Sequence, residues 1–128
     1  MRRLTFEQGV ETLQGLIERE QSLPVLIAVH GKKDSGKTTL INQLVSYFRS
    51  YGSLVANTEG VTIPKNLKDL QYPESTAEII FFHFGSEKPF SNRVPHLSVG
   101  IYNSSRCSKP NYDYNLLIDN LSSEKKVQ

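Results

Sequence analysis

VLIAVHGKKDSGKTTL, residues 25–40, is the part of the chain from which its architecture can be inferred. Its first five residues form a short apolar run of the kind found in strands that are buried on both faces. Gly31 to Thr38 then match the spacing G-x-x-x-x-G-K-[ST], which predicts a loop that binds phosphate groups. Apolar residues at helical spacing follow at once, at positions 40, 41, 44, 45 and 48. Strand, glycine loop and helix in this order are the context that the motif requires.

The residue types in this loop suit phosphate chemistry. Gly31 and Gly36 let the backbone approach phosphate oxygens closely, and successive N–H groups can then face one anion. A helix that begins near Lys37 adds the positive end of its dipole. We expect the Lys37 ammonium to contact the β- and γ-phosphates and the Thr38 hydroxyl to bind Mg²⁺. The expected nucleotide-binding residues are Gly31, Lys32, Lys33, Asp34, Ser35, Gly36, Lys37, Thr38 and Thr39.

Composition narrows the class of protein. The chain has 128 residues, 38% of them hydrophobic, which suits one domain with its own core. A net charge of +2 is too small to indicate a nucleic-acid partner, and no apolar run is long enough to span a bilayer. The single cysteine, Cys107, excludes an internal disulfide. We expect a cytoplasmic protein with one domain at 1–121 and a flexible tail at 122–128, without a membrane partner.

Hydrophobic periodicity predicts two long helices. Thr5 to Gln8 have the pattern of a capping box, and a stripe of apolar residues at helical spacing predicts a helix over 5–21. A second helix is expected from about Lys37 to Tyr51, with Gly52 at its end.

The other elements are shorter. Besides 25–29, strands are expected at 53–57, 78–84, 97–102 and 114–119, with a short helix at 64–70. The connections 85–96 and 103–113 have no helical pattern and are barely long enough for a parallel crossover. One strand could therefore run antiparallel at the edge of the sheet.

Residues 25–40 resemble the P-loop NTPase superfamily, and within it the uridine-kinase-like and related small-molecule kinases. Those kinases often begin with a helix and carry S-G-K-[ST]-T-L, which is similar to residues 35–40. They also often have a late strand ending in I-D-N, similar to residues 118–120. The resemblance implies an α/β fold, a P-loop NTPase-like three-layer sandwich with a mainly parallel sheet that is reduced in its second half. It also implies ATP or GTP with Mg²⁺, and a small hydroxyl compound as acceptor.

The chain departs from those kinases in several places. It has no room for their helical lid or substrate-binding insertion. Only Glu59 lies soon after the second predicted strand, where such enzymes often carry an acidic base. His83, Phe84 and Gly85 stand where a Walker B aspartate is expected. Asp34 puts a negative charge beside a polyanion, which weakens nucleotide binding unless the side chain turns outward.

The loop is also similar to that of the small GTP-binding accessory proteins of molybdenum-cofactor biosynthesis, in which G-x-K-[ND]-S-G-K-T-T-L is common. This likeness ends after Ala56, where the lysine-histidine pair of that family is missing. No N-K-x-D motif for guanine is found in the sequence. The base therefore stays open, with ATP as the default, and so does the oligomeric state.

Three acidic residues are candidates for binding Mg²⁺ or water: Glu59, Glu87 and Asp119. Asp119 ends a hydrophobic strand in the form typical of a Walker B site, although it could instead belong to a solvated turn with Asn120. We assign catalytic roles to Lys37, Asp119 and Glu59, and metal binding to Thr38 and Asp119.

Other polar residues have a structural and a functional interpretation. His83 lies within an apolar strand and is expected to be a packed, hydrogen-bonded histidine. Arg93 and Arg106 lie in loops, where they are either solvated or able to neutralise transferred charge.

Two classes of function follow. The first is an enzyme that transfers a phosphoryl group from a nucleoside triphosphate to water or a small hydroxyl compound. The second is a non-catalytic module that holds a nucleotide as a regulator or as the remnant of a kinase. The intact loop favours the first class, and the missing lid and base favour the second.

Overall fold

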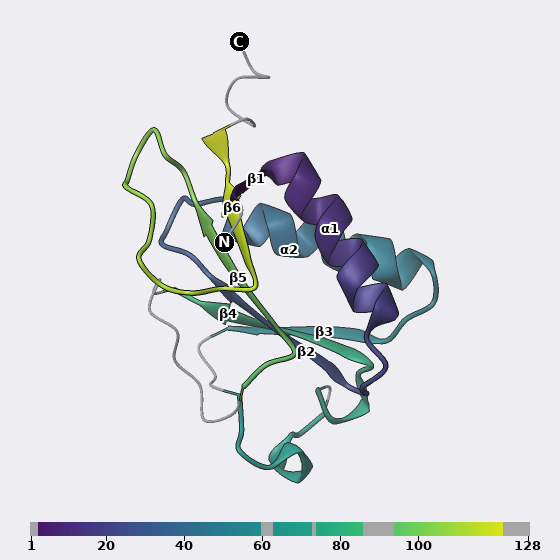
Figure 1. Ribbon diagram of the computed structural model, residues 1–128. Coiled ribbons are helices and arrows are strands. Elements are labelled where there is room, and N and C mark those ends of the chain that lie inside the picture. Colours follow the sequence, from purple (N-terminus) through teal and green to yellow (C-terminus); the bar gives the residue numbers. More distant parts are fainter. Residues whose placement is uncertain (1–2, 60–62, 73, 86–93, 122–128) are drawn as a thin grey trace.

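The computed structural model describes residues 3–59, 63–72, 74–85 and 94–121 (Figure 1). Its elements are β1 (Arg3–Thr5), α1 (Phe6–Arg19), β2 (Val25–His30), α2 (Lys37–Ser50), β3 (Val55–Glu59), β4 (Ile79–Phe84), β5 (Leu97–Tyr102) and β6 (Leu116–Asp119). Two single 3-10 turns, Leu67–Asp69 and Glu74–Thr76, lie between β3 and β4. The tail predicted at 122–128 lies outside the described residues, as do Glu87 and Arg93.

The six strands form one sheet in the order β1-β6-β5-β2-β4-β3, and every recorded pair is parallel. The α/β class and the parallel sheet are thus confirmed, and an antiparallel edge strand is excluded among the described strands. β2 lies near the centre, paired with β4 on one side and β5 on the other. The loop after β2 therefore leaves the sheet between the ends of two neighbouring strands.

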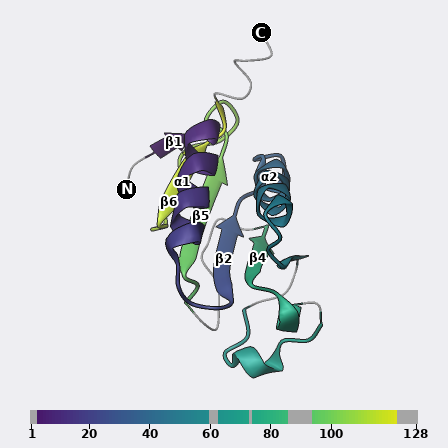
Figure 2. The same ribbon diagram turned by 90° about the vertical axis from the view of Figure 1, so that its right-hand side faces the viewer.

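Both α-helices pack on the same face of the sheet (Figures 1 and 2). Alternate residues of β2 separate the two faces: Val25, Ile27 and Val29 pack with the helices, while Leu26 and Ala28 face the other side. That other side is covered by residues between β3 and β4 that form no α-helix in the described part, among them Ile63 and Leu67. The third layer of the expected sandwich therefore consists of loops and 3-10 turns, and the helix predicted at 64–70 is only one such turn.

The two helices begin and end for local reasons. Thr5 caps α1, and the reciprocal capping box with Gln8 is present, at 3.2 Å and 3.0 Å. α2 ends before Gly52, whose φ of 85° is left-handed. The short strand β1 was not expected, because three residues before a helix carry no strand pattern. It pairs with β6, with Leu4 opposite Ile118.

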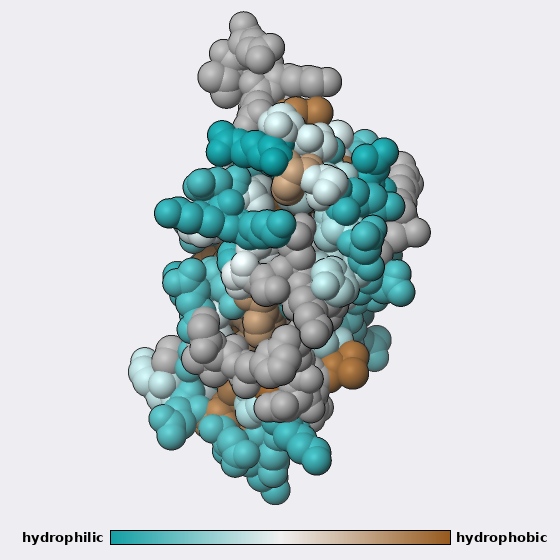
Figure 3. Space-filling view, turned by 90° about the vertical axis from the view of Figure 1, so that its left-hand side faces the viewer, coloured by the Kyte–Doolittle hydropathy of each residue, from teal (hydrophilic) through white to brown (hydrophobic). Residues whose placement is uncertain are grey.

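The surface of the protein is mainly hydrophilic where Figure 3 shows it. Hydrophilic side chains predominate on the face shown in Figure 3, and hydrophobic ones occur there in small separate groups. Among the described residues, neither helix is long and apolar enough to cross a membrane.

Candidate functional site

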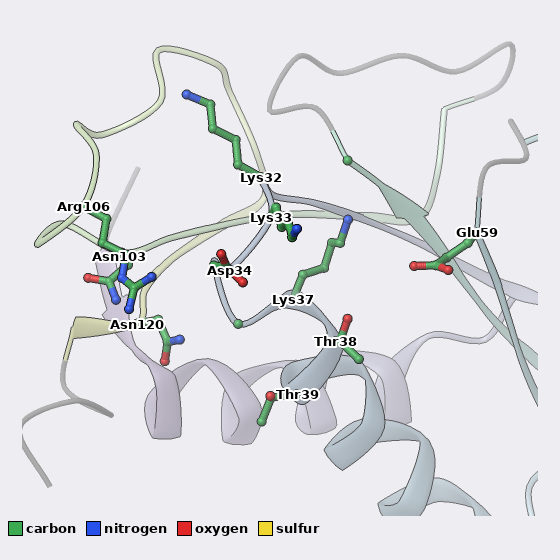
Figure 4. A pocket seen from close by; sticks show the side chains of 12 residues that line it. Lys32, Lys33, Asp34, Lys37, Thr38, Thr39, Glu59, Asn103, Arg106 and Asn120 are labelled. Atoms are coloured by element: carbon green, nitrogen blue, oxygen red, sulfur yellow. The ribbon is translucent and has the colours of Figure 1, made fainter. Parts of the chain in front are cut away.

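The loop of residues 31–36 joins the central strand β2 to α2 and borders a cavity of about 670 Å³ (Figure 4). Two of its residues have a left-handed backbone, Asp34 with φ 67° and Gly36 with φ 97°. The cavity is lined by Lys32, Lys33, Asp34, Gly36, Lys37, Thr38, Thr39, Glu59, Gly85, Asn103, Arg106 and Asn120. Seven of these twelve residues belong to the predicted nucleotide-binding set, so the structure brings most of that set to one cavity.

The amides at the start of α2 are free to bind an anion. The helix has no side-chain cap, and its first recorded backbone hydrogen bond runs from Leu40 N to Gly36 O, at 2.9 Å. Among the described residues, the N–H groups of Gly36, Lys37 and Thr38 donate to no backbone carbonyl. Three adjacent N–H donors at a helix N-terminus can bind a phosphate group. This is the arrangement of amides that the sequence motif predicts.

Lys37 connects the loop to β4. Its Nζ donates to Gly31 O at 3.3 Å and to Phe84 O at 3.1 Å. Burial lowers the pKa of Lys37 below its ordinary value, and the Glu59 carboxylate opposes that shift. An ammonium that has lost part of its hydration gains more from a phosphate than a solvated one does, because the local screening is weaker.

One side of the cavity carries the acidic candidate Glu59, at the end of β3 (Figure 4). Thr38 lies on the same side of the loop, and both side chains are exposed to solvent. Behind Glu59 lies His83, its partner in the β3–β4 register, with Nδ1 3.7 Å from Glu59 Oε1. His83 is 7% exposed, so the packed position expected from the sequence is confirmed. Among the described residues, neither of its ring nitrogens has a hydrogen-bond partner, so the expected hydrogen bonds are not found there.

The other side of the cavity carries polar residues that follow β5 and β6: Asn103, Arg106 and Asn120 (Figure 4). Asn120 Nδ2 donates to Ser35 O at 3.1 Å and thereby ties the end of β6 to the loop. Sequence reasoning missed both asparagines as cavity residues. The available signal was their position directly after a strand, because carboxyl ends of parallel strands meet at one edge of the sheet.

Asp119 is not among the residues that line the cavity. Its Oδ1 accepts hydrogen bonds from the amides of Ser104, at 3.1 Å, and Leu121, at 3.0 Å. These bonds hold the chain where it turns after β6. A metal-binding role for Asp119 stays a prediction, for which Oδ2, the oxygen not engaged by these two amides, would be the ligand.

The described part of the chain does not supply a metal site made of protein side chains alone. The described residues contain no group of three His, Cys, Asp or Glu side chains that could hold a metal ion. A Mg²⁺ ion at Thr38 would therefore take most of its ligands from phosphate oxygens and water, which is how Mg²⁺ is usually bound at nucleotide sites.

Comparison with known proteins relates part of the chain to a described family. Residues 26–84, a little under half of the chain, match the family described as 50S ribosome-binding GTPase. Neither the curated proteins nor the solved structures include a significant match. The parallel sheet, the loop at the end of its central strand and this match place the chain in the P-loop NTPase superfamily. It is a nucleotide-binding P-loop protein.

Proposed function

We propose that the protein binds a nucleoside triphosphate with Mg²⁺ in the cavity beside the loop and hydrolyses its terminal phosphoanhydride bond. The observation that supports this most directly is the row of donor amides at Gly36, Lys37 and Thr38, next to a partly buried ammonium. The match to a GTPase family favours GTP over ATP, and water over a small hydroxyl compound as the acceptor.

The residues of the cavity supply the functions that phosphoryl transfer needs. The loop amides and Lys37 stabilise the charge on the β- and γ-phosphates, and Thr38 supplies a hydroxyl ligand to Mg²⁺. Water forms the new bond to the γ-phosphorus while the bond to the β,γ-bridging oxygen breaks. Glu59 orients this water and takes up its proton, and the nucleoside diphosphate leaves with the bridging oxygen.

A non-catalytic nucleotide-binding module is the second candidate. It is favoured by β4, which ends in His83 and Phe84 where the resemblance predicts an acidic residue for the metal. Among the described residues, Glu59 is then the only acidic residue outside the loop that lines the cavity, and it ends the edge strand β3 rather than a central strand. In that case nucleotide binding is retained, and turnover is very slow or does not occur. A uridine-kinase-like activity is a third candidate, and it requires an added nucleoside.

The test measures binding and hydrolysis together. Fluorescent GTP and ATP analogues are titrated with and without Mg²⁺. Release of free phosphate and formation of the nucleoside diphosphate are both followed, with and without added nucleosides. Lys37→Ala is expected to lower nucleotide affinity at least 10-fold and to abolish phosphate release. Lys68→Ala, in a 3-10 turn away from the cavity, is the charge-matched control.

The outcomes separate the candidates. Binding with phosphate release that depends on Lys37 supports the hydrolase. Phosphate transfer only with an added nucleoside supports the kinase. Binding without release supports the non-catalytic module. If Lys37→Ala binds nucleotide as tightly as the unchanged protein, the loop is not the nucleotide site.

A further inference from the structure

Glu59 and His83 are neighbours on the helix-covered face of the sheet. They lie opposite each other in the parallel pairing of β3 and β4. Val55 of β3 and Phe81 of β4 pack in the core cluster that includes both helices. Because side chains alternate along a strand, Glu59 and His83 lie on that same face, at the end where α2 begins.

His83 is buried without the hydrogen bonds that a buried imidazole needs. Both ring nitrogens are enclosed and, within the part of the chain that the structure describes, neither has a hydrogen-bond partner, although Nδ1 lies only 3.7 Å from Glu59 Oε1. A buried polar atom that stays unpaired has lost its hydrogen bonds to water without replacement, which destabilises the folded state. A shift of less than about 1 Å, within the reach of an exposed glutamate, would bring the pair to hydrogen-bond distance.

We propose that His83 is a positioning residue that directs the Glu59 carboxylate toward the phosphate end of the cavity. In this arrangement the Nδ1–H group of the neutral ring donates to one carboxylate oxygen, and the other oxygen faces Lys37 and Thr38. The inference rests on the proposed function, because the direction matters only if Glu59 acts on a water beside the terminal phosphate.

The surroundings keep the ring neutral, which is the state that this role needs. Burial lowers the pKa of His83, and the nearby Lys37 ammonium lowers it further, while Glu59 acts in the opposite direction. A neutral imidazole has one N–H group, and the hydrogen bond that it makes selects which nitrogen carries the proton. The pairing therefore predicts the Nδ1–H tautomer.

Imidazole ¹⁵N chemical shifts test the pairing without any turnover. The chain has three histidines, so the His83 signals can be assigned by their loss in His83→Gln. The nucleotide-free protein at pH 8 is expected to show His83 mainly as the Nδ1–H tautomer. Glu59→Ala should shift the population toward Nε2–H, whereas the control Glu74→Ala, in a distant 3-10 turn, should not. A tautomer that does not respond to Glu59→Ala overturns the proposal.

Kinetics test the consequence for catalysis. His83→Leu is expected to lower kcat about 10-fold or more with little change in nucleotide affinity, because the lost interaction orients the attacking water. His83→Asn, whose amide is a donor near the position of Nδ1, should recover part of the rate. The double variant with Glu59→Ala should be no slower than Glu59→Ala alone.

Two results distinguish this inference from the proposed function. If the effects of His83→Leu and Glu59→Ala on kcat multiply, the residues act independently and the positioning role is wrong while hydrolysis stands. If the unchanged protein binds nucleotide but releases no phosphate, the proposed hydrolysis is wrong. The response of the His83 tautomer to Glu59→Ala then still decides whether the pair exists.

Discussion

Asn120 Nδ2 donates a hydrogen bond to Ser35 O, at 3.1 Å, across 85 positions of sequence. The same amide occupies the space into which a Cβ at Gly36 would project. A side chain from the end of β6 therefore holds the loop from outside, at the residue whose left-handed backbone precedes α2. The conformation of the loop depends on this contact as well as on its own sequence.

Gly36→Ala is expected to destabilise the protein more than Gly52→Ala. Both glycines have positive φ, at 97° and 85°, so both substitutions carry about 1–2 kcal/mol of backbone strain. Only at Gly36 does the new methyl group meet Asn120, whereas Gly52 has nothing within 4 Å. Overpacking adds about 1–3 kcal/mol to the cost at Gly36.

Urea denaturation measures this difference. Asn120→Ala should reduce the additional cost of Gly36→Ala, because the methyl group then has space. Equal destabilisation by the two glycine substitutions would show that Asn120 does not restrict the loop.

Asp34→Asn is expected to raise nucleotide affinity about 5-fold. Asp34 lines the cavity and is exposed to solvent, which screens its charge. The repulsion between its carboxylate and the phosphates is then on the order of 1 kcal/mol. Asparagine removes the charge and tolerates the left-handed φ of 67°. Titration of a fluorescent nucleotide at low and high salt measures the gain, which should shrink as salt rises. Asp69→Asn, in a 3-10 turn that does not line the cavity, is the control, and a gain of the same size there would contradict the assignment.

Two glycines of α1 should respond to alanine in opposite directions. Gly15→Ala is expected to stabilise the protein by about 0.5–1 kcal/mol, because alanine favours the helix and its methyl group meets only the flexible end of Arg19. Gly9→Ala should instead destabilise it, because the methyl group would overlap the Ile118 side chain, with Cδ1 the closest atom.

Thermal or urea unfolding of the two variants measures both effects. Ile118→Ala removes both Cδ1 and Cγ1, the two atoms that the new methyl group would overlap, and should relieve much of the additional cost of Gly9→Ala. Stabilisation by Gly9→Ala in the unchanged background would mean that α1 and β6 are not in close contact.

The stability of the protein should fall on mild acidification in a way that depends on His83. The pKa of His83 is lowered in the folded state, chiefly by burial, so the unfolded chain binds its proton more readily. The unfolding free energy is then unaffected by this group well above pH 6.5 and decreases as pH falls through that value. The slope for one proton is at most about 1.4 kcal/mol per pH unit.

Urea denaturation at pH 7.5 and 5.5 tests this, with His83→Gln as the comparison. Because both proteins share all their carboxylates, the variant should lose less stability between the two pH values. An equal loss in both would place the acid sensitivity elsewhere.

Local pattern was sufficient for part of the fold and of the site. The capping box at Thr5 and Gln8, the helix from Lys37 and the buried strand before it all depend on residues a few positions apart, and they were confirmed. Boundaries were less accurate: the second predicted strand starts at Val55 rather than Ser53, and β1 was missed. Three residues cannot bury a face of their own, so β1 exists only because β6 is beside it.

The sequence alone specified the phosphate loop, because Gly31, Gly36, Lys37 and Thr38 act through spacing and backbone freedom within one short segment. Which other residues lie around the loop was decided by the order of the strands in the sheet. Asn103 and Asn120 reach the loop because β5 pairs with β2 and β6 pairs with β5. Glu59 lies next to His83 because β3 pairs with β4. Strand order depends on which strands pack their side chains against the same core, and these strands can be far apart along the chain. The hydrophobic periodicity of a single strand does not determine which strands pair.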